Sequence, residues 1–200
     1  MKKLLVIAAL SMIVASCSGE TKRTEPAAAE KTDFETLTER ITADPGDVEA
    51  WYRLADLYNR SGMYRKEVDA LIKVIALKPD MGYAYMELAA AYNRLGQYHD
   101  AIENLQKTKK YFPKNPTVYN NLAVTSGKLG NVDEEIALLK KAISLRPRYG
   151  TARYNLGVVS LRRGERDEAF RQYEELKKFD DAAADALKDE IDKIMKDRKS

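Results

Sequence analysis

The chain has 200 residues, and its 34 lysine and arginine residues nearly balance its 31 aspartate and glutamate residues, which gives a formal net charge of +3. This near-neutral balance argues against a nucleic-acid-binding protein, because such binding rests on many phosphate contacts from a basic surface. The single cysteine excludes a disulfide within the chain, since no second thiol is present.

The N-terminus has the pattern of an export signal. Residues 1–16 begin with two lysines near the start and continue with an apolar run, residues 4–15, that is too short to span a bilayer comfortably. The run ends at Cys17, and Val14-Ala15-Ser16-Cys17 resembles the bacterial lipoprotein box, in which the cysteine becomes the lipidated first residue. This resemblance predicts a lipoprotein signal peptide and lipidation at Cys17. An ordinary cleaved signal with a stray cysteine, or an uncleaved anchor, is the alternative.

The segment that follows, residues 17–31, is polar and includes Pro26 and three consecutive alanines. It has too little apolar surface to offset the entropy of ordering, so we expect a flexible tether. In the lipoprotein family the residue after the cysteine helps to decide sorting, and here it is Ser18 rather than aspartate. The resemblance therefore implies an anchor in the outer membrane of the cell envelope, with the rest of the chain facing the periplasm.

Residues 32–47 are predicted to form a helix, because three apolar side chains recur there at helical spacing: Phe34, Leu37 and Ile41. Pro45 follows this stripe and lies 34 residues before Pro79. Because the rest of the chain repeats that step, the segment is interpreted as the second half of a truncated repeat.

A 34-residue step runs through residues 48–181. Four leucines, four glycines and three prolines keep this step: Leu54, Leu88, Leu122 and Leu156; Gly62, Gly96, Gly130 and Gly164; Pro79, Pro113 and Pro147. A small residue follows each leucine and an aromatic residue precedes most of them by three places, which is the spacing of one buried helical face. The glycine allows a left-handed turn after the first helix and the proline ends the second, so each step encodes a helical hairpin.

This pattern resembles the tetratricopeptide repeat family. The resemblance implies an all-α solenoid of about four and a half repeats that binds proteins or peptides. The complete units are residues 48–81, 82–115, 116–149 and 150–181, called units one to four below. Residues 182–200 carry an apolar stripe and are predicted to form a C-terminal capping helix and tail.

Stacked units of this family curve, and their first helices line a concave groove whose ligand positions recur in every unit. Carried onto this chain, these positions form the predicted partner-binding surface: Tyr52, Asp56, Asn59, Arg60, Tyr83, Met86, Asn93, Arg94, Asn120, Val124, Lys128, Tyr154, Val158 and Arg162. Tyrosine and arginine are enriched at binding hot spots, and asparagine can pair with an extended backbone. The expected ligand is a peptide or helix of another protein.

Two polar columns leave alternatives open. The basic ladder recurs at the 34-residue step: Arg60, Arg94, Lys128 and Arg162. These cations either interact with the dipole at a helix C-terminus or contact a ligand. Glu67 and Glu135 occupy a column that is usually alanine in the family, and their carboxylates either reach water or an arginine, or form a paired polar element in the groove wall. The family's carboxylate clamp is not predicted, because only Asn121 and Asn155 occupy matching columns.

Seven arginines fall between residues 146 and 171: Arg146, Arg148, Arg153, Arg162, Arg163, Arg166 and Arg171. They suggest an alternative function, in which the chain binds an anionic glycan or lipid through unit four. The acidic residues of the predicted capping helix offer a competing explanation, because they could neutralise these arginines internally. We expect internal neutralisation.

Catalytic motifs are missing from the sequence. His99 is the single histidine, and no phosphate-binding glycine loop or cluster of metal ligands occurs. We therefore predict no enzyme activity, no cofactor and no metal. The favoured function is a docking scaffold in the assembly of an envelope complex, by analogy with pilotins of the type IV pilus secretin or adaptors of peptidoglycan hydrolases and proteases. A homo-oligomeric structural element is a third possibility.

Overall fold

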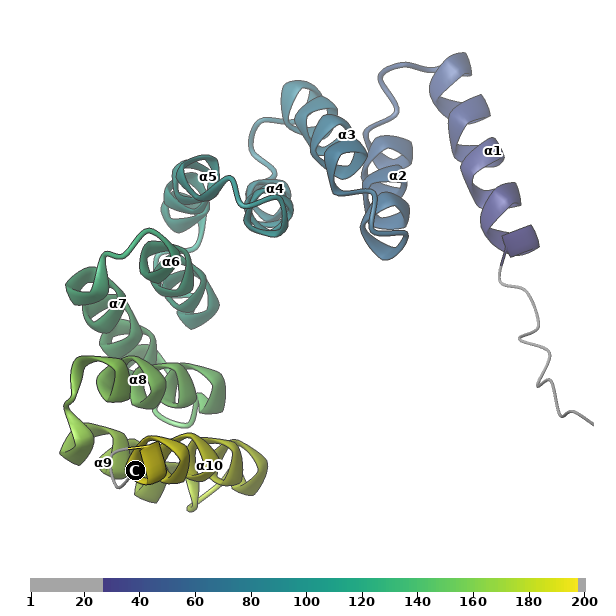
Figure 1. Cartoon of the computed structure of the whole chain (residues 1–200). Coiled ribbons are helices and arrows are strands. Elements are labelled where there is room, and N and C mark those ends of the chain that lie inside the picture. The colour runs from purple at the N-terminus through teal and green to yellow at the C-terminus, as the bar shows by residue number, and fades with distance from the viewer. Residues whose placement is uncertain (1–26, 198–200) are drawn as a thin grey trace, which may run out of the picture.

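The computed structural model describes residues 27–197, which contain ten α-helices and no strand (Figure 1). In chain order the helices are α1 (Ala27–Ala43), α2 (Val48–Arg60), α3 (Tyr64–Leu77), α4 (Gly82–Arg94), α5 (Tyr98–Tyr111), α6 (Pro116–Lys128), α7 (Val132–Leu145), α8 (Gly150–Arg163), α9 (Arg166–Leu176) and α10 (Asp181–Asp197). The predicted signal peptide and Cys17 lie outside the described residues. Within residues 27–197, no helix is long and apolar enough to cross a membrane.

Helices α2 to α9 form four hairpins that correspond to units one to four. Figure 1 shows these hairpins stacked side by side in an arc. The first helices α2, α4, α6 and α8 lie on the inner, concave side, and the second helices α3, α5, α7 and α9 lie on the outer side. The predicted all-α solenoid is therefore confirmed.

Each hairpin turns at a glycine with left-handed backbone. Gly62, Gly96, Gly130 and Gly164 have φ angles of 71°, 74°, 83° and 86°. A side chain in this region is strained, whereas glycine enters it freely. The 34-residue glycine column thus has a direct conformational cause.

A hydrogen bond ties the start of each first helix to the proline that precedes it. The aromatic donors and proline carbonyl acceptors are Trp51 to Pro45 (3.1 Å), Tyr85 to Pro79 (3.1 Å) and Tyr119 to Pro113 (2.7 Å). Unit four has Arg153 in the aromatic column, and its Nε donates to the carbonyl of Pro147 at 2.8 Å. Arg153 therefore keeps the structural bond of the aromatic residues that it replaces.

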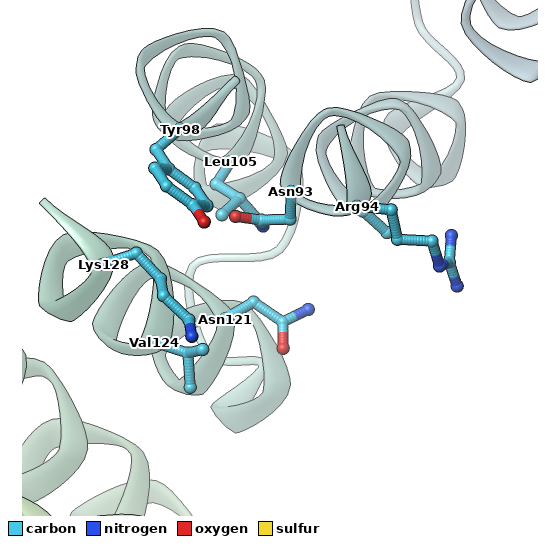
Figure 2. Close-up of a pocket in the computed structure, with 8 residues that line it drawn as sticks. Asn93, Arg94, Tyr98, Leu105, Asn121, Val124 and Lys128 are labelled. Atoms are coloured by element: carbon cyan, nitrogen blue, oxygen red, sulfur yellow. The ribbon is translucent and has the colours of Figure 1, made fainter. Parts of the chain in front are cut away.

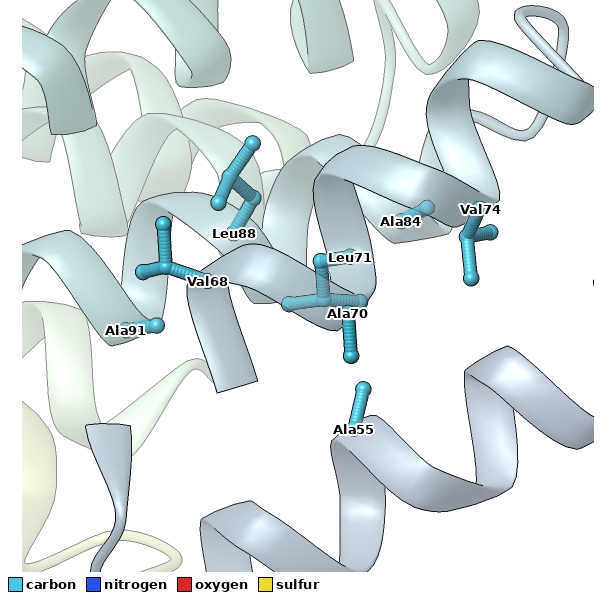
Figure 3. Packing of buried hydrophobic residues seen from close by; sticks show 8 residues of the cluster. All are labelled: Ala55, Val68, Ala70, Leu71, Val74, Ala84, Leu88 and Ala91. Atoms are coloured by element: carbon cyan, nitrogen blue, oxygen red, sulfur yellow. The ribbon is translucent and has the colours of Figure 1, made fainter. Parts of the chain in front are cut away.

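The hydrophobic core of the described residues runs along the array as successive clusters. Figure 3 shows the cluster in which Ala55 of α2, Leu71 of α3 and Leu88 of α4 meet. Equivalent clusters join α4, α5 and α6, and then α6, α7 and α8. Because each cluster takes residues from one unit and from the first helix of the next, neighbouring units stabilise each other.

The N-terminal helix is longer than the predicted partial repeat. Helix α1 begins at Ala27, inside the segment 17–31 that was expected to be a tether. Three consecutive alanines start this helix, and alanine is the strongest helix former, which explains why the helix extends toward the N-terminus. Leu37 of α1 packs with Leu54 and Leu57 of α2, so α1 covers the first end of the array.

The C-terminal helix α10 packs on α8 and α9 and covers the other end. It begins at Asp181, in the column where the other units have proline, and Asp180 Oδ1 accepts a hydrogen bond from the Ala183 amide (3.1 Å). Gly157 replaces the alanine of the small-residue column at this contact. A Cβ atom at Gly157 would lie 2.5 Å from Leu187 Cδ2, so glycine lets the capping helix approach closely.

Candidate ligand groove

The predicted ligand positions lie along the first helices but differ in exposure. Tyr83 at the start of α4 is 52% exposed, and Val124 on α6 is 38% exposed. Asp56 and Arg60 of α2 are exposed and pair with each other at 3.1 Å. An exposed pair of this kind contributes little to stability, so both side chains stay available to a ligand.

Several predicted groove residues instead join neighbouring units. Tyr52 of unit one donates a hydrogen bond through its hydroxyl to Glu87 Oε1 of unit two, at 2.5 Å. Asn155 Nδ2 of unit four donates to Asn120 Oδ1 of unit three, at 3.0 Å. Asn120 is only 6% exposed, so its amide lies within the groove wall rather than on the surface, which corrects its predicted position.

Glu87 was not among the predicted groove residues. Its half-buried carboxylate has a pKa raised by burial, and burial together with the bond to this carboxylate raises the pKa of the Tyr52 hydroxyl. Both inter-unit bonds join residues 35 positions apart in the sequence. That spacing, one more than the repeat, is the only sequence signal that could have indicated these pairs.

The two unusual glutamates are buried and meet the basic ladder. Glu67 is 1% exposed; Asn59 Nδ2 donates to its Oε1 at 2.7 Å, and Arg94 Nη1 lies 3.7 Å from the same oxygen. Glu135 is 6% exposed, and Arg162 Nη2 donates to its two oxygens at 2.9 and 2.7 Å. Burial raises the pKa of Glu67, while the bond from Asn59 and the charge of Arg94 lower it. Arg94 and Arg162 therefore belong to the groove wall as well as to the ladder.

Three further predicted contacts pack against the core. Met86 is half-buried against the cluster that joins α4, α5 and α6. Tyr154 and Val158 of α8 are half-buried against the cluster that includes α10. Tyr154 and Val158 thus also contact α10, which occupies the place beside α8 that the first helix of another unit would take (Figure 1).

A pocket of about 380 Å³ lies between α4, α5 and α6. Its lining comes from these three helices: Ala90, Asn93, Arg94, Tyr98, Leu105, Asn121, Val124 and Lys128. Figure 2 shows Asn121, Val124 and Lys128 on one side and Asn93 and Tyr98 on the other. Asn93 Nδ2 also donates to Thr125 Oγ1 at 2.9 Å. Four of these residues were predicted to line the groove, whereas Tyr98 and the pocket position of Asn121 were not.

The chemistry of this pocket suits an anionic or amide group rather than a metal ion. It has cationic, amide and hydroxyl groups but no carboxylate. Within residues 27–197, no group of three or more histidine, cysteine, aspartate and glutamate side chains is placed to hold a metal ion. The guanidinium of Arg94 points away from the pocket in Figure 2 and lies 5.2 Å from the ring of Tyr64.

The arginines near unit four are mostly engaged within the fold. Arg153 donates to Gln172 at 2.8 Å, Arg163 pairs with Asp133, and Arg171 lies 2.9 Å from Glu168. Internal neutralisation thus occurs, but these partners lie on α7 and α9, not on the capping helix as expected. The acidic cap residue Asp192 pairs within α10 instead, with Lys188 at 2.5 Å.

Comparisons with known proteins agree with this geometry. Family models described as tetratricopeptide repeat match residues 48–81, 86–148 and 127–193. No curated protein matches the sequence. Among solved structures, a MamA protein is 24% identical with a TM-score of 0.70, over 76% of this chain and 83% of that chain. MamA from Desulfovibrio magneticus RS-1 is 19% identical with a TM-score of 0.72, over 77% of this chain and 87% of that chain. MamA MSR-1 is 26% identical with a TM-score of 0.64, over 82% of this chain and 90% of that chain.

Proposed function

This chain belongs to the tetratricopeptide repeat family, and on that premise we propose that it is a non-enzymatic scaffold whose concave groove binds a segment of another protein. The pocket between α4, α5 and α6 carries this proposal, because an exposed apolar side chain, Val124, lies there beside the cation Lys128 and the amide of Asn121. Apolar area combined with directional polar groups is what a peptide or helix ligand requires.

The alternative ligand, an anionic glycan or lipid bound through unit four, is less well supported. Of the seven arginines near unit four, Arg153 and Arg162 are bonded to groups within the fold. The side chain of Arg153 is only 12% exposed. A glycan or lipid would therefore have to displace internal partners before it reached these guanidinium groups.

The groove proposal is tested by photocrosslinking in intact cells. A photoreactive residue at Val124 is expected to crosslink to one protein, because a bound segment lies against that side chain. Phe170 on the outer helix α9 is a matched control, since it is 39% exposed against 38% for Val124. The same crosslinked species from both positions, or none from Val124, would contradict the proposal.

We further propose that the scaffold is lipid-anchored through Cys17 in the outer membrane, faces the periplasm and serves the assembly of an envelope complex, in the manner of a secretin pilotin or a hydrolase adaptor. The support is the N-terminal pattern of a short apolar run followed by a lipoprotein box. A permanent anchor would hold the groove close to the membrane at which such complexes assemble.

Replacement of the predicted lipidated residue tests the anchor. Cys17→Ser is expected to abolish incorporation of labelled palmitate and to release the protein from the membrane fraction, because serine cannot form the thioether. Ser18→Asp is the companion variant: it keeps the cysteine and is expected to retain the label but to move to the inner membrane. Palmitate-free protein that stays in the membrane after Cys17→Ser would instead indicate an uncleaved signal anchor.

A further inference from the structure

Polar pairs join unit one to unit two and unit three to unit four, but not unit two to unit three at the same positions. The first kind of pair joins a glutamate of one unit to an arginine of the next, as in Glu67–Arg94 and Glu135–Arg162. At the junction of units two and three, Ala101 stands at the position of the glutamate and Lys128 at the position of the arginine. Ala101 is fully buried and has no carboxylate to offer, so the cation of this junction lacks the partner that its equivalents have.

A second kind of pair between neighbouring units is also absent from the junction of units two and three. The pairs of this kind are Tyr52–Glu87 and Asn120–Asn155. The residues at these positions between units two and three are Met86 and Asn121, and the thioether of Met86 packs against the core and cannot donate. Within residues 27–197, the Lys128 ammonium therefore makes no ion pair and the Asn121 amide makes no side-chain hydrogen bond, although both line the pocket.

We propose that this junction binds the side-chain carboxylate of an aspartate or glutamate in the partner segment. The partner's carboxylate takes the place of the glutamate that the chain lacks at position 101: it pairs with Lys128 and accepts a hydrogen bond from Asn121. This inference rests on the proposed function and deepens it, because it specifies an acidic residue as the central anchor of the ligand.

The donors around the pocket match those that hold the buried glutamate of unit one. Asn93 stands in the column of Asn59, which donates to Glu67, and Lys128 stands in the column of Arg94. The pocket residues Tyr98 and Leu105, labelled in Figure 2, lie one turn before and one turn after Ala101 on α5, so a side chain at position 101 shares their face of the helix. A single unpaired cation with neutral donors fits one carboxylate better than a phosphate.

The test uses a random-sequence peptide library displayed with blocked C-termini and selected on the purified full chain. Selected peptides are synthesised as C-terminal amides, and their affinities are measured by fluorescence anisotropy. Changing one Asp or Glu of the peptide to its amide is expected to weaken binding about tenfold, which is the scale of one charge-assisted contact. Lys128→Gln is expected to cause the same loss, and the two changes together no further loss.

Three variants of the protein separate the pocket from other effects. Lys128→Arg is expected to retain binding, because Arg94 and Arg162 occupy the same column. Ala101→Glu is expected to lose binding of the peptide, because the carboxylate of the new glutamate then forms an ion pair with Lys128. Lys140→Gln, which removes an exposed cation from α7, is the matched control and leaves affinity unchanged.

The possible outcomes distinguish this inference from the groove proposal. The inference is overturned if the selected peptides lose affinity for the Tyr83→Ala protein but keep full affinity when their acidic residue is replaced, or keep full affinity for the Lys128→Gln protein. In that case the groove proposal still stands. Peptides that are insensitive to Tyr83→Ala, Lys128→Gln and Ala101→Glu contradict both, as does the recovery of no binding peptide. Circular dichroism confirms that each variant keeps its helices, and Lys128→Gln changes an exposed residue that no core contact depends on.

Discussion

Leu122→Ala is expected to lower the free energy of unfolding by about 2–5 kcal/mol, the range for deleting a buried leucine side chain. Leu122 is 1% exposed and lies in the cluster that joins α4, α5 and α6. The substitution leaves a cavity at the middle of the array, where the first two units meet the last two. In a solenoid such contacts between neighbours supply much of the stability, so this change also weakens the coupling between the halves.

Denaturant unfolding followed by circular dichroism measures this effect. Leu77→Ala provides the same chemical change at the end of α3, where the leucine is 43% exposed, and is expected to cost no more than about 0.5 kcal/mol. The denaturant concentration at the midpoint of unfolding should therefore fall for Leu122→Ala and hardly change for Leu77→Ala. Equal shifts for the two variants would show that the central junction contributes no more than an exposed helix end.

Gly82→Val is expected to destabilise the protein by about 1–3 kcal/mol, because it overpacks a closed contact. Gly82 is buried at the start of α4, and a Cβ atom there would lie 2.7 Å from Tyr111 Cβ and 2.8 Å from Phe112 Cε2. Tyr111 Cβ is bound directly to the backbone and cannot swing away. The ring of Phe112 lies 4.5 Å from that of Tyr83, so relief of the clash also displaces a predicted groove residue.

Thermal unfolding of Gly82→Ala and Gly82→Val checks this expectation, and the loss of stability should grow with the size of the side chain. Thr151→Val is the control, since it introduces valine in the exposed first turn of α8 and keeps the β-branched shape. A Gly82→Val protein that unfolds at the parent temperature would show that the junction of α4 with the end of α5 can open without cost.

The junction between units two and three differs in structure from its two neighbours, because it lacks their polar pairs at the same repeat positions. The junctions on either side pair polar side chains across the units, Tyr52 with Glu87 and Asn120 with Asn155. A partner that supplies the missing carboxylate would complete the wall at the centre of the groove. Binding there contacts both halves of the arc at once, since the pocket draws its lining from α4 and α5 of unit two and from α6 of unit three.

The sequence by itself determined the repeat length, the helical hairpins and the all-α solenoid. These follow from local rules: left-handed backbone needs glycine at Gly62 and its equivalents, and apolar side chains at helical spacing need a covered face. The hairpin turns and the stacking order were therefore predictable before any contact was known. Helix α1 covers Ala27–Ala43, because alanine propensity extends it N-terminally beyond the predicted segment 32–47.

Only the tertiary structure decided which polar residues face a ligand and which join the units. The ladder cations Arg94 and Lys128 are equivalent in the sequence and line the same pocket, yet Arg94 meets a buried glutamate and Lys128 makes no ion pair within residues 27–197. Likewise Asn120 is buried, and the equivalent glycines Gly82 and Gly150 meet different groups, Tyr111 in the first case and Asp180 in the second. Such contacts join residues from different units, and the 34-residue period describes positions within a unit without specifying which side chains meet across the interface between two units.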